Sequence, residues 1–397
     1  MDEQKLVPKL RFPGFTDPWE QRKLGEIYKR VNERNDGTLG RDKWISVAKM
    51  YFQDPEKVQS NNLDTRTYVM KKGDIAFEGH PNNEFKFGRF VLNDIGTGII
   101  SELFPIYRPI VKYDLEFWKY AIQLERIMAP IFSKSITSSG NSSNKLDQNH
   151  FLNQMISIPT IDEQKKIGLI LKTITNLITL HQRKLEHLKL KKKSLLQKLF
   201  PREGELYPEL RFPGFTDPWE QRKLGEVFDE RNEKGEQGEL LSVTIGAGVV
   251  RTEDLERAVN TSDDRYNYKV VKKGDLIYNT MRMWQGACGS SLYTGIVSPA
   301  YTVLVPLAGN SSKFFAHYFK RKDLLYLFKR YSQGLTSDTW NLKFNVLKEI
   351  KICVPLIEEQ YKIADFLEAY DSNLTLHQRK LEHLQLLKKA LLQQLFV

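Results

Sequence analysis

A perfect internal repeat constrains this chain of 397 residues more than any other feature of it. The seventeen letters LRFPGFTDPWEQRKLGE occupy positions 10–26 and return unchanged at 210–226. A second repeat, TLHQRKLEHL, stands at 179–188 and 375–384, inside longer segments that align without a gap. The order of short module, variable region and long segment therefore occurs twice. It predicts two related domains in tandem, and the length suits two cores, since domains commonly hold about 100–200 residues.

Composition shifts define the expected boundaries. The stretch PREGELYPE, which follows the first long segment, contains two prolines and a glycine and is typical of a turn into a new domain. We expect five parts: a first domain with its opening module (1–158), a long helix (159–200), a linker (201–210), a second domain (211–354) and a second long helix (355–397).

The two long segments have the heptad pattern of a coiled coil, with apolar residues at alternating spacings of three and four. The first seam consists of Leu171, Ile174, Ile178, His181, Leu185, Leu188, Lys192, Leu195 and Leu199, and the second of Leu367, Tyr370, Leu374, His377, Leu381, Leu384, Lys388, Leu391 and Leu395. We expect the helices to pair as an antiparallel coiled coil with pseudo-two-fold symmetry. The expected pairing residues are Leu171, Ile178, Leu185, Leu188, Leu374, Leu381, Leu384 and Leu391. The histidines and lysines of the seams are interpreted as packing and register positions.

The start of each long helix carries its own signal. Thr160 with Glu163 predicts a capping box, and the acidic residues that follow suit the positive end of the helix dipole. The second copy has Leu356 in place of Thr160, so its helix must begin with a different cap.

The variable regions alternate short β-type runs such as YTVLVPL with single helical patches such as EFWKYAIQLERIMAPIF. Each therefore predicts a mixed α/β globule, and the whole chain an α+β fold. No apolar run approaches the roughly 18 residues of a membrane span, and the polar start does not resemble a signal peptide, which favours a cytoplasmic protein without membrane contact. The two cysteines, Cys288 and Cys353, stand alone, so neither a disulfide framework nor a metal site is expected.

The sequence contains no phosphate loop, HExxH, GxGxxG or GxSxG motif, and we expect no catalytic residue. Asp338 with Glu349 and Lys351 resembles a nuclease triple, but the first half has no match for it. The formal charge of +11 and the pI near 9.3 instead favour a nucleic-acid partner. Identical modules would bind two copies of one partner, and diverged domains would bind unlike targets. Three functions remain open: a component that reads two DNA half-sites, a stand-alone DNA-binding regulator, or a coiled-coil scaffold for proteins.

Several residues carry a resemblance to a known family. The helix starts PTIDEQ (159–164) and PLIEEQ (355–360), the heptads after them and the RFPGF…W…KLGE module before each variable region resemble the specificity subunit of type I restriction-modification enzymes. The resemblance covers essentially the whole chain. It implies two target-recognition domains that read a bipartite, asymmetric double-stranded DNA sequence with a fixed gap. It also implies docking of two methylation subunits and, through them, of motor-nuclease restriction subunits. S-adenosylmethionine, ATP and magnesium would be used by those partners, and this chain would hold no cofactor.

Two segments in each domain are candidates for DNA contact. SSGNSSNK (138–145) and YSQGLTSDTW (331–340) follow a helix and are rich in small hydrogen-bonding side chains, which suit base edges and phosphates, although ordinary solvated turns have the same composition. Lys86 and Arg89 follow the KKGD turn of the first domain (71–74), and Arg282, Trp284 and Gln285 follow that of the second (272–275). Arginine suits guanine and glutamine suits adenine, whereas surface ion pairs are the alternative. Trp284 fits a stacking platform and a core position equally. The candidate residues are Lys86, Arg89, Ser138, Ser139, Asn141, Asn144, Lys145, Arg282, Gln285, Ser332, Gln333, Thr336 and Ser337.

Overall fold

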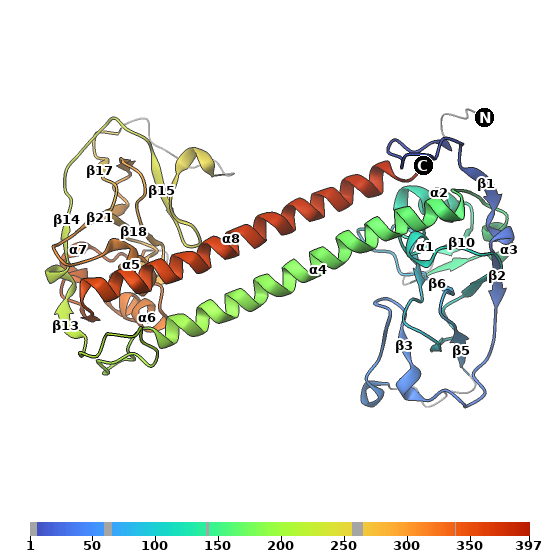
Figure 1. Cartoon of the computed structure of the whole chain (residues 1–397), viewed down its shortest axis with the longest axis horizontal. Coiled ribbons are helices and arrows are strands. Elements are labelled where there is room, and N and C mark those ends of the chain that lie inside the picture. Colours follow the sequence, from blue (N-terminus) through green and yellow to red (C-terminus); the bar gives the residue numbers. More distant parts are fainter. Residues whose placement is uncertain (1–5, 59–65, 140–142, 256–264, 338) are drawn as a thin grey trace. The chain divides into compact units, whose positions relative to one another are not determined.

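The chain forms two compact units in the computed structural model, which describes residues 6–58, 66–139, 143–255, 265–337 and 339–397. Unit 1 combines Met1–His181 with Lys380–Val397, and unit 2 is Gln182–Arg379. Each unit therefore contains one module, one variable region, the first half of one long helix and the second half of the other (Figure 1). The boundaries expected from the sequence differ from these units, because they treat each long helix as a separate part. They stay a prediction.

Unit 1 contains twelve of the named strands. They are β1 (Glu20–Lys23), β2 (Tyr28–Val31), β3 (Ile45–Ser46), β4 (Tyr51–Phe52), β5 (Thr67–Met70), β6 (Ile75–Glu78), β7 (Arg89–Leu92), β8 (Gly98–Ser101), β9 (Ile106–Pro109), β10 (Ile136–Ser139), β11 (Asn144–Leu146) and β12 (Met155–Ile158). Its helices are α1 (Leu115–Ala121), α2 (Glu125–Ser133), α3 (Gln148–Leu152) and the first part of α4 (Ile161–Lys198).

Unit 2 repeats this plan with fewer strands. The strands are β13 (Glu220–Lys223), β14 (Phe228–Glu230), β15 (Leu241–Thr244), β16 (Gly248–Arg251), β17 (Lys269–Val271), β18 (Leu276–Asn279), β19 (Cys288–Ser290), β20 (Gly295–Val297), β21 (Tyr301–Pro306) and β22 (Lys351–Val354). The helices are α5 (Ser312–Tyr318), α6 (Lys322–Tyr331), α7 (Phe344–Leu347) and the first part of α8 (Ile357–Gln394).

The centre of each unit is a four-stranded antiparallel sheet with the same topology. The strand order is β2-β9-β6-β7 in unit 1 and β14-β21-β18-β19 in unit 2. Alternate residues of the central strands enter different cores, because successive side chains of a strand point to opposite faces. Ile75 and Phe77 join the core that includes the helices, whereas Ala76 joins the core beneath β3, β5 and β8. Leu276 and Ile277 divide in the same way in unit 2. The predicted mixed α/β globules are confirmed.

A buried Glu-Gln pair fixes the start of each long helix. Glu163 accepts two hydrogen bonds from Arg11 of the module, at 2.8 and 3.0 Å, and Glu359 accepts two from Arg211, both at 2.8 Å. The capping box is therefore wrong in its second half: Glu163 N–H donates to the Thr160 hydroxyl at 3.4 Å, but the Glu163 carboxylate binds Arg11 instead of the backbone. At the second helix no side chain replaces Thr160, as expected, and the Glu359 N–H donates to a backbone carbonyl.

The adjoining glutamines join each long helix to the variable region. The Gln164 side chain accepts from the N–H of Asp114, the N-cap of α1, and donates to the carbonyl of Pro159. Gln360 does the same with Ser311, the N-cap of α5, and with Pro355. The PxIxEQ pattern therefore joins the module, the variable region and the long helix of a unit.

The end of each long helix packs into the unit that does not contain its start. Leu391, Leu395 and Phe396 belong to the main core of unit 1, together with Leu171 and Ile174 of α4. Leu199 and Phe200 belong to the main core of unit 2, together with Leu367 of α8. The two helix segments in each core therefore run antiparallel. The modules follow the same rule, because Leu10 N–H donates to Gln394 O in unit 1, and Leu210 N–H to Lys198 O in unit 2.

The predicted heptad seams are confirmed, because they form the less exposed face of each long helix. Helix α4 begins two residues after and ends two residues before the bounds expected from the sequence, 159–200. Every seam residue from Leu171 to Leu199 and from Leu367 to Leu395 is buried or half-buried. The seam lysines have local partners, since Lys192 forms an ion pair with Asp371, and the Lys388 ammonium lies 5.2 Å from the ring centre of Tyr120. Burial lowers the pKa of Lys388. The expected pseudo-two-fold relation of the two halves stays a prediction.

Among the described residues, no helix combines the length and the apolar character that a bilayer-spanning segment requires.

Candidate nucleic-acid interface

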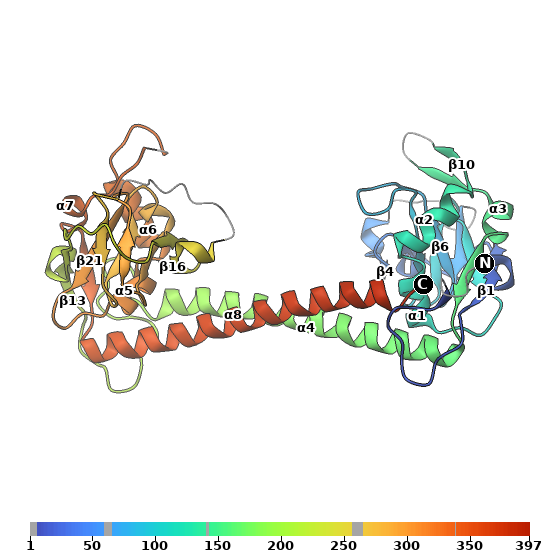
Figure 2. The ribbon, with the colours of Figure 1, turned by 90° about the horizontal axis from the view of Figure 1, so that it is seen from above.

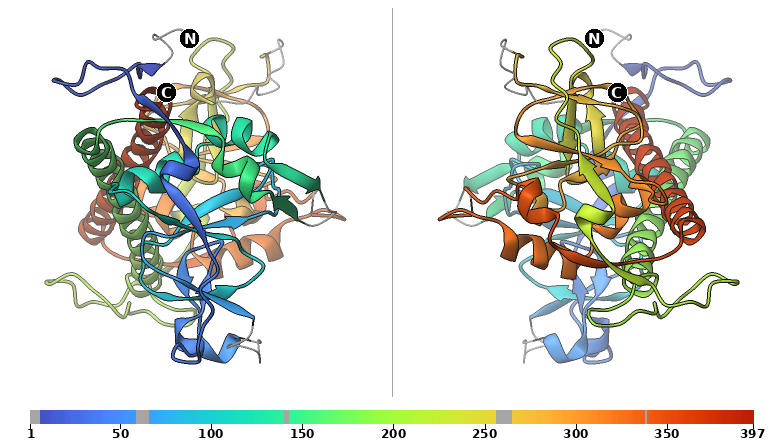
Figure 3. Two further views of the ribbon diagram at one scale, coloured as in Figure 1. Left: turned by 90° about the vertical axis from the view of Figure 1, so that its right-hand side faces the viewer. Right: turned by 90° about the vertical axis from the view of Figure 1, so that its left-hand side faces the viewer.

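The two candidate segments of each variable region, though far apart in sequence, lie together in the structure. The first loop cluster consists of residues 79–89, 136–139 and 143–146 of unit 1. The second loop cluster consists of residues 280–287, 332–337 and 339–342 of unit 2. Both clusters lie where the central strand, β6 or β18, ends. Within its own unit each lies on the side away from the long helices (Figures 2 and 3).

The first loop cluster is built on a close backbone contact. The Asn144 N–H donates to the carbonyl of Gly79 at 2.8 Å, and a Cβ at Gly79 would lie only 2.2 Å from the Asn144 oxygen. The segment 138–145, expected as a loop, forms a β-hairpin of β10 and β11, because Ile136 pairs with Leu146 and both contact the main core.

The residues of the first loop cluster that were predicted to contact DNA differ in their side-chain partners and in their exposure to solvent. The Arg89 guanidinium donates to Glu78 at 2.8 Å and to the Ala48 carbonyl at 2.7 Å, so it makes the ion pair that was its alternative interpretation. The Lys86 ammonium lies 5.6 Å from the centre of the Phe87 ring. Asn144 is half-exposed and Lys145 exposed, in strand β11. Ser138 and Ser139 belong to β10, and Asn141 lies outside the described residues.

The second loop cluster is anchored by backbone and tyrosine hydrogen bonds. Leu342 N–H donates to Thr280 O at 2.9 Å, and Gln333 and Asn341 exchange two backbone hydrogen bonds at 3.0 and 2.8 Å. The Tyr278 hydroxyl donates to the Leu342 carbonyl at 3.0 Å, and burial raises the pKa of Tyr278, which keeps it a neutral donor. The loop is therefore held at its base while its tip is open to solvent.

Two tryptophans form the surface between the segments of the second loop cluster. Trp284 and Trp340 meet edge to face with ring centres 5.2 Å apart, and both are half-exposed. The Trp284 indole donates to Met281 O at 3.0 Å, and the Lys329 ammonium lies 5.1 Å from the centre of the Trp340 ring. Trp284 is therefore a surface aromatic and no core residue.

The polar candidates of the second loop cluster surround these rings. Arg282 is exposed and donates to Gln285 at 3.4 Å, a weak contact that a base edge can replace. Gln333, Thr336 and Ser337 are exposed, whereas the Ser332 hydroxyl is engaged with the Phe328 carbonyl at 2.8 Å. Exposed amide, hydroxyl and guanidinium groups are the ones that read base edges.

Sequence reasoning missed two members of the second loop cluster, Leu335 and Trp340, and the neighbouring Lys329 of α6. Leu335 is 101% exposed at the tip of the loop, and Trp340 and Lys329 complete the aromatic surface. An aromatic residue that closes a run of small polar residues was the available signal for Trp340. A single leucine among small polar residues does not indicate a functional position, because sequence patterns identify apolar positions only when they recur with the period of a helix or strand.

Two reactive side-chain types of unit 2, a thiol and a carboxylate, have structural surroundings. Cys288 in β19 is fully buried, and burial raises its pKa to about 11, so it stays a thiol. Glu349 of the nuclease-like triple forms an ion pair with Lys223 at 2.7 Å, and Asp338 lies outside the described residues. The two loop clusters expose hydrogen-bond donors and acceptors, cations and aromatic rings, and such groups suit a binding surface.

Comparison with known proteins agrees with the repeat. The family described as "Type I restriction modification DNA specificity domain" matches residues 16–190 and again 216–386. A type I restriction enzyme specificity subunit, MjaVIII of Methanocaldococcus jannaschii, is 27% identical over 98% of this chain and 93% of its own. A second protein of that organism, a putative MjaX specificity subunit, is 22% identical over 98% and 95%.

The fold has a counterpart among solved structures. The crystal structure of a type I restriction-modification S subunit from M. genitalium has a TM-score of 0.58 and 14% sequence identity, and the match covers 98% of this chain and 99% of that one. At this identity the likeness concerns the fold alone.

Proposed function

Since the chain belongs to the type I restriction-modification DNA specificity family and is its specificity subunit, we propose that it reads one bipartite, asymmetric DNA sequence. The first loop cluster contacts one half-site and the second loop cluster the other. The long helices hold the two units at the spacing that fixes the gap between half-sites. Half-sites on one face of B-DNA recur about 34 Å apart or at multiples of this distance.

One observation carries this proposal. In both units, two segments chosen from sequence come together at the end of the same central strand, but with different chemistry. The first cluster presents a polar hairpin with Asn144 and Lys145, and the second presents Arg282, Gln285 and a pair of tryptophans. Equal scaffolds with unlike reading surfaces suit a target with two unlike halves.

The repeated sequences support docking of two methylation subunits. Within the module and the TLHQRKLEHL segment, identity includes side chains that the fold leaves in solvent, while residues 165–178 and 361–374 between them have diverged. Packing cannot require identity at exposed positions, whereas two copies of one partner can. The exposed identical positions, in first-copy numbering, are Leu10, Pro13, Gly14, Thr16, Asp17, Pro18, Glu20, Gln21, Lys23, Glu26, Thr179, Leu180, Gln182, Arg183, Lys184, Glu186 and His187.

Catalysis belongs to the partners in this proposal. The methylation subunits transfer the methyl group of S-adenosylmethionine to adenine, and restriction subunits that join them use ATP and magnesium. This chain supplies sequence recognition and the scaffold for assembly, and it acts in the cytoplasm, where the host DNA lies. A stand-alone regulator or a protein scaffold would have no use for the two identical docking surfaces.

Genome-wide mapping of methylated adenines tests the proposal. The chain is co-expressed with the methylation subunit encoded beside it, and methylation is read by single-molecule sequencing. We expect a two-part motif with a fixed gap that is absent when this chain is omitted. A matched variant, Arg282→Ala with Gln285→Ala, is expected to relax the motif in one half only. A stable, stoichiometric complex that adds no methylation would contradict the proposal and leave a scaffold or a regulator.

A further inference from the structure

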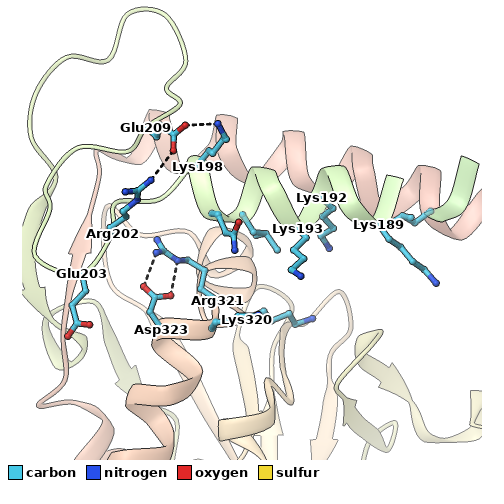
Figure 4. Close-up of a pocket in the computed structure, with 14 residues that line it drawn as sticks. Lys189, Lys192, Lys193, Lys198, Arg202, Glu203, Glu209, Lys320, Arg321 and Asp323 are labelled. Carbon is cyan, nitrogen blue, oxygen red and sulfur yellow. Dashed lines mark hydrogen bonds and ion pairs between the residues drawn. The ribbon is translucent and has the colours of Figure 1, made fainter. Parts of the chain in front are cut away.

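A groove lined by basic residues lies in unit 2, apart from the second loop cluster. It has a volume of about 810 Å³ and opens between the last turns of α4, the linker after it and the start of α6 (Figure 4). Leu196 and Leu374 supply apolar wall, and the rest of the lining is mainly charged. The charged lining residues are Lys189, Lys192, Lys193, Lys198, Arg202, Lys320, Arg321 and Lys322 on the basic side, and Glu203, Glu209 and Asp323 on the acidic side.

Half of the basic side chains in this groove are neutralised. Lys192 pairs with Asp371, Lys198 and Arg202 share Glu209, and Arg321 forms two hydrogen bonds with Asp323. The ammonium groups of the other four lysines form no hydrogen bond or ion pair with any described residue, and we call the site that they line the lysine groove. These lysines are Lys189, Lys193, Lys320 and Lys322. In Figure 4 the labelled side chains of Lys189, Lys193 and Lys320 extend into open space.

Unit 1 has a groove at the same place that is less basic, with Arg126, Lys388 and Lys389 against Glu125 in its lining. It has a volume of about 520 Å³ and lies between the end of α8 and the start of α2. Glu125 begins α2 where Lys322 begins α6, and Gln385 takes the place of Lys189 in the repeat. Gln123 takes the place of Lys320, and only Lys193 has a basic counterpart, Lys389. The higher positive charge is therefore a property of unit 2 and not of the repeated scaffold.

Neither the helix dipole nor the shared partner explains these lysines. The dipole favours cations only within the last turn of a helix, and Lys189 lies more than two turns before Lys198, the end of α4. A dock for two copies of one methylation subunit needs the same surface in both units, whereas this surface differs between them. A ligand of the lysine groove would therefore meet a surface that unit 1 does not reproduce.

The lysine groove adjoins the second loop cluster. The Lys320 Cγ lies 3.7 Å from the position of a Cβ on Gly286, the residue that closes the 3-10 turn Met283–Gln285. Helix α6 connects the groove, at Lys322, with Lys329 beside Trp340, and its ten residues span about 15 Å. Basic side chains thus extend from the reading surface to the groove, as a backbone-contacting surface of DNA-binding proteins does.

We propose that the lysine groove binds the sugar-phosphate backbone of the DNA beside the half-site that the second loop cluster reads, and that the less basic groove of unit 1 makes a weaker contact. The inference rests on the proposed function. Four ammonium groups without protein partners release condensed counterions when they approach phosphates, which adds affinity without sequence preference. Unit 2 then holds the DNA more strongly than unit 1, although both read bases.

A charge-removal variant of the methyltransferase complex tests this inference. Lys189, Lys193 and Lys322 are exposed, so Lys189→Gln with Lys193→Gln and Lys322→Gln removes charge without disturbing the core. The matched control removes three exposed lysines of unit 2 that do not line the groove: Lys273→Gln with Lys348→Gln and Lys351→Gln. Binding to the mapped target duplex is measured as a function of salt concentration.

The groove variant should bind the target about 10- to 100-fold more weakly near 0.15 M salt, with a salt slope lower by about 2–3, since each lost phosphate contact removes about 0.9. Its methylation motif should stay unchanged, and the control should match the wild type. An unchanged affinity and salt slope would overturn the inference, as would loss of the methylation subunit from the complex. A wild-type complex that binds no bipartite target would instead refute the proposed function, which keeps the two failures distinct.

Discussion

Buried charge pairs hold the repeated parts of each unit together at the scale of single residues. Glu163 and Glu359 are each about 1% exposed and depend on Arg11 and Arg211 for compensation. Asp74 and Asp275 of the KKGD turns are equally buried and bind Arg108 and Arg231. The sequence predicted the glutamates as helix-start residues but not their partners, because an arginine 148 residues away carries no local signal.

Breaking one of these pairs should be costly, while replacing both partners should not. We expect Arg11→Ala to destabilise unit 1 by about 3–5 kcal/mol, because it leaves the Glu163 carboxylate buried without a counter-charge. The double variant Arg11→Met with Glu163→Leu should recover most of this loss. Urea unfolding of the parent, Arg11→Ala and the double variant measures it, and Arg211→Ala in unit 2 is the matched comparison. A loss under about 1 kcal/mol for Arg11→Ala would show that the pair is not required.

At the scale of elements, prediction succeeded where the chain is periodic. The long helices and their seams follow from heptads, since a 3.5-residue repeat specifies one buried face. The reading segments were located by composition alone, which does not distinguish a hairpin from a loop. Segment 138–145 became a hairpin because Ile136 and Leu146 anchor its base, whereas 332–342 is held by backbone bonds at Gln333 and Asn341. Their juxtaposition with the turns after β6 and β18 is tertiary and left no sequence signal.

The close contact between the hairpin and Gly79 predicts a selective defect. In Gly79→Ala the new methyl would lie 2.2 Å from a backbone oxygen of β11, so the hairpin must move. We expect about tenfold weaker binding and reduced discrimination in the half-site read by unit 1, with discrimination in the other half intact. Competition binding with single-base variants of the target measures both. Gly40→Ala is the control, since its methyl meets only the flexible Asp42 side chain. Equal loss in both halves would argue against an assignment of one cluster to each half-site.

At the scale of the whole molecule, duplication makes each unit complete only with the end of the other helix. The exact repeats predicted tandem domains, and the hydrogen bond from Leu10 N–H to Gln394 O joins the opening module to the end of the second helix. The sequence did not indicate how each variable region accepts that end. Arg126 of α2 donates to Val397 O, and Arg321 before α6 donates to Pro201 O. These arginines occupy different positions in their helices and perform the same role, so alignment of the repeats could not pair them.

Because both scaffolds present the same residue types, one variable region should function on either. Leu391, Leu392, Leu395 and Phe396 repeat Leu195, Leu196, Leu199 and Phe200. We therefore expect a chain in which residues 27–155 are replaced by a copy of 227–351 to fold and to dock both methylation subunits. The strand pair β1 and β12 is kept by this exchange, apart from the exposed Met155. Its methylation motif should contain the second half-site twice and the first not at all.

One position needs adjustment in this exchange. A Cβ at Gly168 would lie 2.5 Å from the Asp114 side chain, whereas unit 2 has Ala364 at the corresponding place. The transplanted α5 normally packs against the Ala364 methyl group, which Gly168 lacks. Gly168→Ala should therefore restore this contact in the exchanged chain, whereas in the parent the new methyl group would clash with Asp114 and destabilise the fold. Single-molecule sequencing of host DNA reads the motif, with the parent chain in parallel. If the exchanged chain still methylates the first half-site, or assembles fully and recognises neither, recognition does not reside in the variable regions as separate units.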